Sequence, residues 1–165
     1  MRLAAIDIGS NAARLLITDV IPGLQGEPEF IKVVLVRVPL RLGFDVFDKG
    51  EISSGKSDKI IKTIKAYKLL LDVYEVKHLK ACATSAMRDA VNAPEIIKKV
   101  QTETGIGIEV ITGDQEASLI YENHIAENLS VEESYLYIDV GGGSTELTFF
   151  SDGEMVFKKS FNIGT

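Results

Sequence analysis

The sequence has little of what several classes of protein require. Its 165 residues include one cysteine, two histidines and no tryptophan. The single Cys82 cannot form an intramolecular disulfide or a thiolate zinc cage, and His78 and His124 lack the spacing of metal ligands. These absences exclude a disulfide-stapled miniprotein and a cysteine-ligated zinc protein.

Long apolar runs and excess basic charge are also missing. No apolar stretch approaches the roughly 20 residues that a membrane-spanning helix needs, and the first residues turn polar at Asp7, too early for a signal peptide. Lys and Arg total 18 against 24 Asp and Glu, which gives a net charge of −6 and argues against a dedicated nucleic-acid binder. We therefore expect a cytoplasmic protein with neither a membrane nor a nucleic acid as partner.

The distribution of apolar residues predicts an α/β protein. Predicted strands cover 2–8, 13–20, 30–38, 78–83, 108–111 and 135–140, and predicted helices cover 55–74, 84–103 and 115–128. Residues 39–52 contain a proline and two glycines and are predicted to form a loop. Three strands followed by helix, strand, helix, strand and helix is the order of a ribonuclease-H-like lobe, a mixed β-sheet flanked by helices.

An internal repeat places the same strand–turn–strand pattern near both ends of the chain. Residues 5–17 read AIDIGSNAARLLI and residues 137–150 read YIDVGGGSTELTFF, so that Asp7 matches Asp139. After a third strand the copies reach Arg-Leu-Gly and Asn-Ile-Gly, which end at Gly43 and Gly164. The repeat therefore predicts two related halves.

We interpret residues 1–128 as a complete lobe and residues 129–165 as the start of a similar second lobe. Residues 134–165 are expected to form an antiparallel three-stranded meander whose apolar face has no helices to cover it. Such a sheet favours pairing with another chain, so we expect a homodimer.

Both Gly-rich turns have the composition of a phosphate and metal site. Glycines let backbone N–H groups approach an anion, and an Asp at the strand end can hold Mg²⁺ against phosphate oxygens. One such turn is more often only a hairpin turn, but two related turns, each with the Asp, favour a phosphate site. The candidate phosphate-binding residues in the turns are Gly9, Ser10, Asn11, Gly141, Gly142, Gly143, Ser144 and Thr145.

Four segments in order then resemble one known family. They read DIGSN at 7–11, TSAMRDA at 84–90, GDQEA at 113–117 and DVGGGSTE at 139–146. This set is similar to the motifs of the exopolyphosphatase/guanosine pentaphosphate phosphatase family, within the actin, Hsp70 and sugar-kinase superfold. The chain departs from the family at Gln115, where members often carry an acidic residue.

The resemblance implies an activity and a cofactor. It implies a phosphoanhydride hydrolase in which water attacks the terminal phosphate of inorganic polyphosphate, with Mg²⁺, in a cleft between two lobes. The alternative substrate within the family is guanosine pentaphosphate, which would lose its 5′ terminal phosphate. A sugar or acyl kinase of the same superfold and a non-catalytic polyphosphate- or nucleotide-binding module remain open.

The resemblance also assigns roles to five side chains, which we expect to converge on one site. Glu116, in the first turn of a helix, would orient the attacking water, and Arg88 would clamp phosphate oxygens with its planar guanidinium. Asp7, Asp139 and Glu146 would hold the metal.

A row of lysines on the predicted helix 55–74 has two interpretations. Lysines recur at i+3 spacing, at Lys56, Lys59, Lys62, Lys65 and Lys68. Such a row could guide a polyanion, but a charged row opposite an apolar stripe is usually a solvated helix face.

Overall fold

The computed structural model describes residues 1–23, 27–120, 130, 132–161 and 163–164. Its contacts divide the chain into two units, Met1–Val110 and Ile111–Thr165. The lobe boundary predicted at 128/129 lies outside the described residues. In the described part of the chain, no helix is long and apolar enough to span a membrane.

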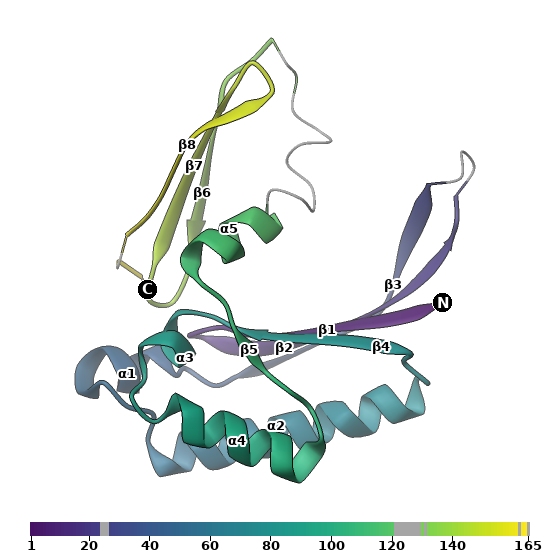
Figure 1. Cartoon of the computed structure of the whole chain (residues 1–165), viewed down its shortest axis with the longest axis vertical. Helices are drawn as coiled ribbons and strands as arrows, with labels where there is room; N and C mark the ends of the chain where they lie inside the picture. The colour runs from purple at the N-terminus through teal and green to yellow at the C-terminus, as the bar shows by residue number, and fades with distance from the viewer. Residues whose placement is uncertain (24–26, 121–129, 131, 162, 165) are drawn as a thin grey trace. The chain divides into compact units, whose positions relative to one another are not determined.

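The first unit is built on a five-stranded mixed sheet (Figure 1). Its strands are β1 (Arg2–Ile8), β2 (Ala12–Pro22), β3 (Pro28–Pro39), β4 (His78–Ala83) and β5 (Glu109–Val110). The strand order is β3-β2-β1-β4-β5, with β1, β2 and β3 antiparallel and β1, β4 and β5 parallel. This topology confirms the predicted ribonuclease-H-like lobe.

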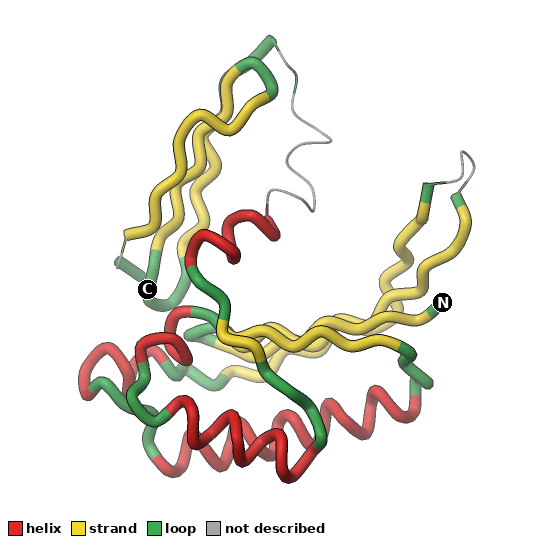
Figure 2. The backbone as a smooth tube through the Cα atoms, in the orientation of Figure 1, coloured by secondary structure: helices red, strands yellow, loops and turns green. Residues whose placement is uncertain are grey.

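Helices cover one face of this sheet. The unit contains α1 (Gly43–Lys49), α2 (Ser54–Val73), α3 (Ser85–Asp89) and α4 (Ala93–Thr104), and α2 packs beside α4 under the strands (Figures 1 and 2). Alternate strand residues such as Ile6 and Leu15 pack against Ile64 and Val100 in the core. The hydroxyl of Tyr67, on α2, donates a hydrogen bond of 3.0 Å to the carbonyl oxygen of Ala13, and burial raises the pKa of Tyr67 to about 12.

The predicted loop at 39–52 is wrong, because it contains α1. The helix starts at Gly43 and stops at Gly50, whose φ of 75° makes it a left-handed C-cap. Leu42 and Val46 are buried in the core beside it. Tertiary packing therefore holds a helix where Pro and Gly alone indicated a loop.

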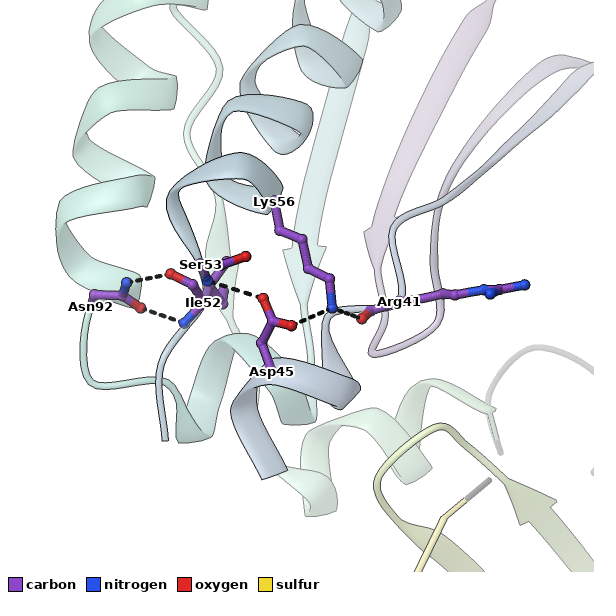
Figure 3. A network of polar contacts seen from close by, with 6 residues as sticks. All are labelled: Arg41, Asp45, Ile52, Ser53, Lys56 and Asn92. Carbon is purple, nitrogen blue, oxygen red and sulfur yellow. Dashed lines mark hydrogen bonds and ion pairs between the residues drawn. The ribbon is translucent and has the colours of Figure 1, made fainter. Parts of the chain in front are cut away.

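Polar contacts join α1 to the start of α2 (Figure 3). The Nζ of Lys56 donates to Oδ1 of Asp45 at 2.6 Å and to the carbonyl oxygen of Arg41 at 2.5 Å. On the other side, the side-chain amide of Asn92 makes two hydrogen bonds with the backbone of Ile52. These contacts fix the segment between β3 and α2.

The second unit contains a separate antiparallel sheet. It consists of α5 (Gly113–Ile120) and the strands β6 (Tyr135–Val140), β7 (Thr145–Ser151) and β8 (Glu154–Phe161), in the order β6-β7-β8. The sheet confirms the predicted meander. The Nζ of Lys158 donates a hydrogen bond to the carbonyl oxygen of Asp114 at 2.5 Å, which ties α5 to β8. The predicted helix 115–128 is described as far as Ile120; its remainder lies outside the described residues.

We predict that Asp45→Asn lowers stability near neutral pH by on the order of 1–2 kcal/mol. Hydrogen bonds from Lys56 and Ser53 lower the pKa of Asp45 from 3.8 to about 2. A lowered carboxyl pKa stabilises the fold above pH 3.8, and this contribution is lost as the pH falls toward 2.

Chemical denaturation at a series of pH values tests this. The unfolding free energies of wild type and Asp45→Asn should converge at low pH. Asp58→Asn, whose side chain is 61% exposed, is the control. Parallel curves for wild type and Asp45→Asn would contradict the assignment.

Candidate active site

The first Gly-rich turn connects β1 to β2. The amide of Gly9 donates to the carbonyl oxygen of Ala12 at 3.0 Å and closes the turn. Asp7 lies opposite Arg14 in the strand register, and its Oδ2 is 3.3 Å from Nη1 of Arg14. The carboxylate at this turn therefore has a cation of the same hairpin beside it.

Ser10 joins this turn to the segment that carries Arg88. Its side chain is buried, and its Oγ lies 2.7 Å from the Oγ of Ser85 and accepts a hydrogen bond from the amide of Ala86 at 3.2 Å. These two residues begin α3, on which Arg88 follows with a side chain that is 28% exposed. The turn and the arginine helix are thus fixed to each other inside the first unit.

The lone cysteine lies beside Asp7 but has no sign of nucleophilic activation. Cys82 on β4 is the register partner of Asp7 and is partly buried. Burial raises its thiol pKa above the usual value of 9.0, so that the neutral thiol dominates near pH 7.

The second Gly-rich turn repeats the geometry of the first. The amide of Gly141 donates to the carbonyl oxygen of Ser144 at 2.8 Å, as Gly9 does to the residue three positions on. Asp139 lies opposite Glu146, seven residues later, just as Asp7 lies opposite a residue seven positions later. The internal repeat seen in the sequence therefore extends to hydrogen bonding and register.

A glycine packs against each turn from the end of the third strand of its copy. The amide of Gly43 donates to the carbonyl oxygen of Ser10 at 3.0 Å. A Cβ placed on Gly164 would lie 2.3 Å from the amide nitrogen of Gly143 and 2.5 Å from the carbonyl carbon of Gly142. The second turn therefore has no room for a side chain at position 164.

The residue that faces the aspartate is a cation at the first turn and an anion at the second. Asp139 and Glu146 are directly paired across β6 and β7, and like charges in that position repel each other. Glu146 is 5% exposed, and its Oε1 accepts a hydrogen bond from the Oγ of Ser160 at 2.8 Å. A cation between the two carboxylates would relieve the repulsion.

This pair has the donor chemistry that Mg²⁺ uses. Magnesium is commonly bound by one or two carboxylates together with substrate phosphate oxygens and water. Within the described residues, no three His, Cys, Asp or Glu side chains gather into a metal-binding group. Two carboxylates match the share of the magnesium shell that a protein supplies when phosphate oxygens and water provide the rest.

Glu116 lies in the first turn of α5, whose start is held by a capping box. The amide of Gln115 donates to Oγ1 of Thr112 at 3.1 Å, while Oε1 of Gln115 accepts from the amide of Thr112 at 2.9 Å. The Gln that departs from the family motif thus completes the cap. The amide of Glu116 donates to the carbonyl oxygen of Thr112 at 2.9 Å, which fixes its backbone at the positive end of the helix.

The structure distributes the predicted site residues between the two units. Asp7, the turn 9–11 and Arg88 belong to Met1–Val110, whereas Glu116, Asp139, the turn 141–145 and Glu146 belong to Ile111–Thr165. The predicted roles of these residues stay predictions. Sequence reasoning missed three polar residues that hold them in place, which are Arg14, Ser85 and Ser160. The seven-residue offset was the available signal for Arg14. Thr112 was one of two caps that the sequence predicts for the helix of Glu116, and the structure confirms it.

The sheet topology and the repeated turns define a class, the actin-like proteins built on ribonuclease-H-like lobes. The model of the Ppx/GppA phosphatase family matches residues 26–165, and the chain belongs to this family.

Similar proteins agree with this assignment. The chain is 31% identical to exopolyphosphatase 1 of Mycobacterium tuberculosis, over 99% of this chain and 46% of that protein. It is 34% identical to a bifunctional 3-dehydroquinate synthase/phosphatase of Fusobacterium nucleatum, over 98% of this chain and 25% of that protein. The chain therefore spans from a quarter to about half of the length of these curated relatives.

Solved structures show the same relationship. An exopolyphosphatase from Cytophaga hutchinsonii superposes with a TM-score of 0.87 at 33% identity, over 99% of this chain and 51% of that chain. The Ppx/GppA family member of Aquifex aeolicus gives a TM-score of 0.79 at 35% identity, over 99% of this chain and 52% of that chain. The ethanolamine utilization protein EutJ from Carboxydothermus hydrogenoformans shares the fold alone, at 15% identity and a TM-score of 0.53.

We predict that Ser10→Ala destabilises the protein by about 1–3 kcal/mol. The substitution removes the hydroxyl that accepts a hydrogen bond from the amide of Ala86 and contacts the hydroxyl of Ser85. The amide and the Ser85 hydroxyl would then be buried without this partner. Ser54→Ala, at an exposed position on α2, should change stability by less than about 0.5 kcal/mol. Urea unfolding of both variants measures the difference, and equal stabilities would contradict the role of Ser10.

We also predict that Gly164→Ala destabilises the protein, by about 1–3 kcal/mol. The new Cβ would overlap backbone atoms of the second turn, which cannot move aside as a flexible side chain would. Gly55→Ala is the matched control, because no atom lies within 4 Å of its Cβ position and alanine favours the helix. Thermal unfolding should show a lower Tm only for Gly164→Ala; a Tm at or above that of the wild type would contradict the close packing.

Proposed function

We propose that the protein carrying this sequence is a phosphoanhydride hydrolase that releases the terminal phosphate of inorganic polyphosphate. The observation that carries the proposal is the pair of Gly-rich turns with the same hydrogen bond and register but opposite neighbouring charges. The turn at 9–11, whose Asp7 is paired with Arg14, joins the arginine helix and with Arg88 suits a phosphate anion. The turn at 141–145 has two facing carboxylates and suits a cation.

Each side chain then has a physical task in hydrolysis. The guanidinium of Arg88 would bind phosphate oxygens in a bidentate manner and stabilise the charge that develops on them. Backbone N–H groups of the turns would hold the same oxygens. The carboxylate of Glu116 would accept a hydrogen bond from the attacking water and orient it toward phosphorus.

We include Mg²⁺ in the proposal, held by Asp139 and Glu146 and with Asp7 as a further oxygen donor. The ion would neutralise phosphate charge and so favour attack by water. The proposal requires both turns to serve one substrate in a cleft between two lobes. Support comes from family membership and from the exopolyphosphatases among the relatives.

We predict that Glu116→Gln lowers the rate of phosphate release by about 10²–10⁴-fold while polyphosphate binding is nearly unchanged. The amide keeps the shape of the side chain but loses the charge that orients water. Arg88→Lys should weaken both binding and turnover, because an ammonium group cannot replace the planar fork. Asp114→Asn, a charge change two residues earlier on an exposed part of α5, is the control.

The assay measures phosphate release from polyphosphate, guanosine pentaphosphate and ATP side by side, with and without Mg²⁺. Faster phosphate release from polyphosphate supports the proposal. Faster release from guanosine pentaphosphate would identify that nucleotide as the substrate instead. A rate for Glu116→Gln close to that of the wild type would remove this residue from the mechanism.

A further inference from the structure

A cavity adjoins the first turn on the side away from β4. It has a volume of about 690 Å³ and lies between the end of β3, α1 and the start of α2. Its walls are formed by Val38, Pro39, Leu40, Arg41, Phe44, Lys56 and Lys59. This volume lies within the range of ordinary small-ligand pockets, about 300–1,000 Å³.

Backbone hydrogen bonds make the cavity wall continuous with the turn. The amides of Leu40 and Arg41 both donate to the carbonyl oxygen of Asn11, at 3.0 and 2.9 Å. The cavity wall and the turn are therefore adjacent parts of the first unit.

Arg41 has an unusual backbone and an uncommitted side chain. Its φ of 53° lies in the left-handed region, which glycine occupies with less strain. Its amide and carbonyl are both bonded, to Asn11 and Lys56, so that the position of its Cα is fixed. Figure 3 shows its guanidinium pointing away from Asp45 and Lys56.

Of the three cations around the cavity, two are open to a ligand. Lys56 is paired with Asp45. Among the described residues, the side chains of Arg41 and Lys59 have no hydrogen bond or ion pair, and both are exposed. No carboxylate is among the described residues that form the cavity wall.

We propose that Arg41 and Lys59 form a subsite for the phosphate groups that follow the terminal one. This subsite rests on the proposed function, because the terminal phosphate is placed in the turn at 9–11. A chain of phosphates leaving that turn would pass Arg41 first and Lys59 next, and each cation would bind one group along it. The subsite would bind the extended substrate, while the turns and Arg88 would bind the phosphate that is released.

The test is calorimetric binding of long-chain inorganic polyphosphate to this chain at several salt concentrations. Arg41→Gly removes the guanidinium and accepts the positive φ, so a loss of binding cannot come from backbone strain. We expect about tenfold weaker binding for Arg41→Gly and for Lys59→Ala. The slope of log K against log salt concentration should also fall by about one for each variant.

Lys62→Ala is the matched control, because it removes the same charge from the same helix outside the cavity. It should leave affinity and slope close to those of the wild type. The subsite is overturned if Arg41→Gly and Lys59→Ala have the same affinity and salt slope as Lys62→Ala. It is also overturned if the wild type does not bind polyphosphate. The Tm of every variant is measured to confirm that it folds.

The same titration with guanosine pentaphosphate separates the two sources of a phosphate chain. Affinity for either probe that depends on Arg41 supports the subsite, and the more dependent probe identifies the preferred substrate. Arg41-dependent binding without phosphate release would defeat the proposed function and leave the subsite intact. Phosphate release by a protein whose affinities are the same in the wild type, Arg41→Gly and Lys59→Ala would overturn the subsite and leave the proposed function intact.

Discussion

The register of β1 between its two neighbours is the constraint on which the first unit depends. Ile8, the last residue of β1, pairs with Ala13 across the turn and with Ala83 at the end of parallel β4. Because parallel strands end at the same edge of a sheet, the Gly-rich turn and the start of the arginine helix emerge side by side. The contact between Ser10 and Ser85 is the consequence, and a shift of one residue in either strand would remove it.

Much of the fold was readable because its signals are local. The predicted strands at 2–8 and 78–83 agree with the structure to the residue. The helix α1 was not predicted, because what stabilises it is not local. Leu42 and Val46 enter a core formed by distant strands, and the hydrogen bond from Gly43 goes to a turn more than thirty residues earlier.

The candidate site likewise has local features that the sequence predicts and non-local contacts that it does not. The repeat pointed to the two turns from the sequence, because Asp and Gly recur there in a fixed order, and the resemblance of four motifs to one family made Arg88 and Glu116 candidates. The inward direction of Ser10 was not predictable, since it depends on Ser85 reaching the same place through β4. Sequence alone did not show Ser160 beside Glu146 either, because that contact needs the register of β7 and β8.

The position seven residues after each aspartate also bears on how the two halves diverged. If both hairpins descend from one duplicated ancestor, the strands, the turn hydrogen bond and the supporting glycine have been kept in both copies. The residue facing the aspartate has changed between Arg14 and Glu146. This position therefore separates a hairpin whose aspartate is paired with an arginine from one whose aspartate faces a second carboxylate. Two hairpins that share a strand register and a turn hydrogen bond thus differ in net charge at the position that faces the aspartate.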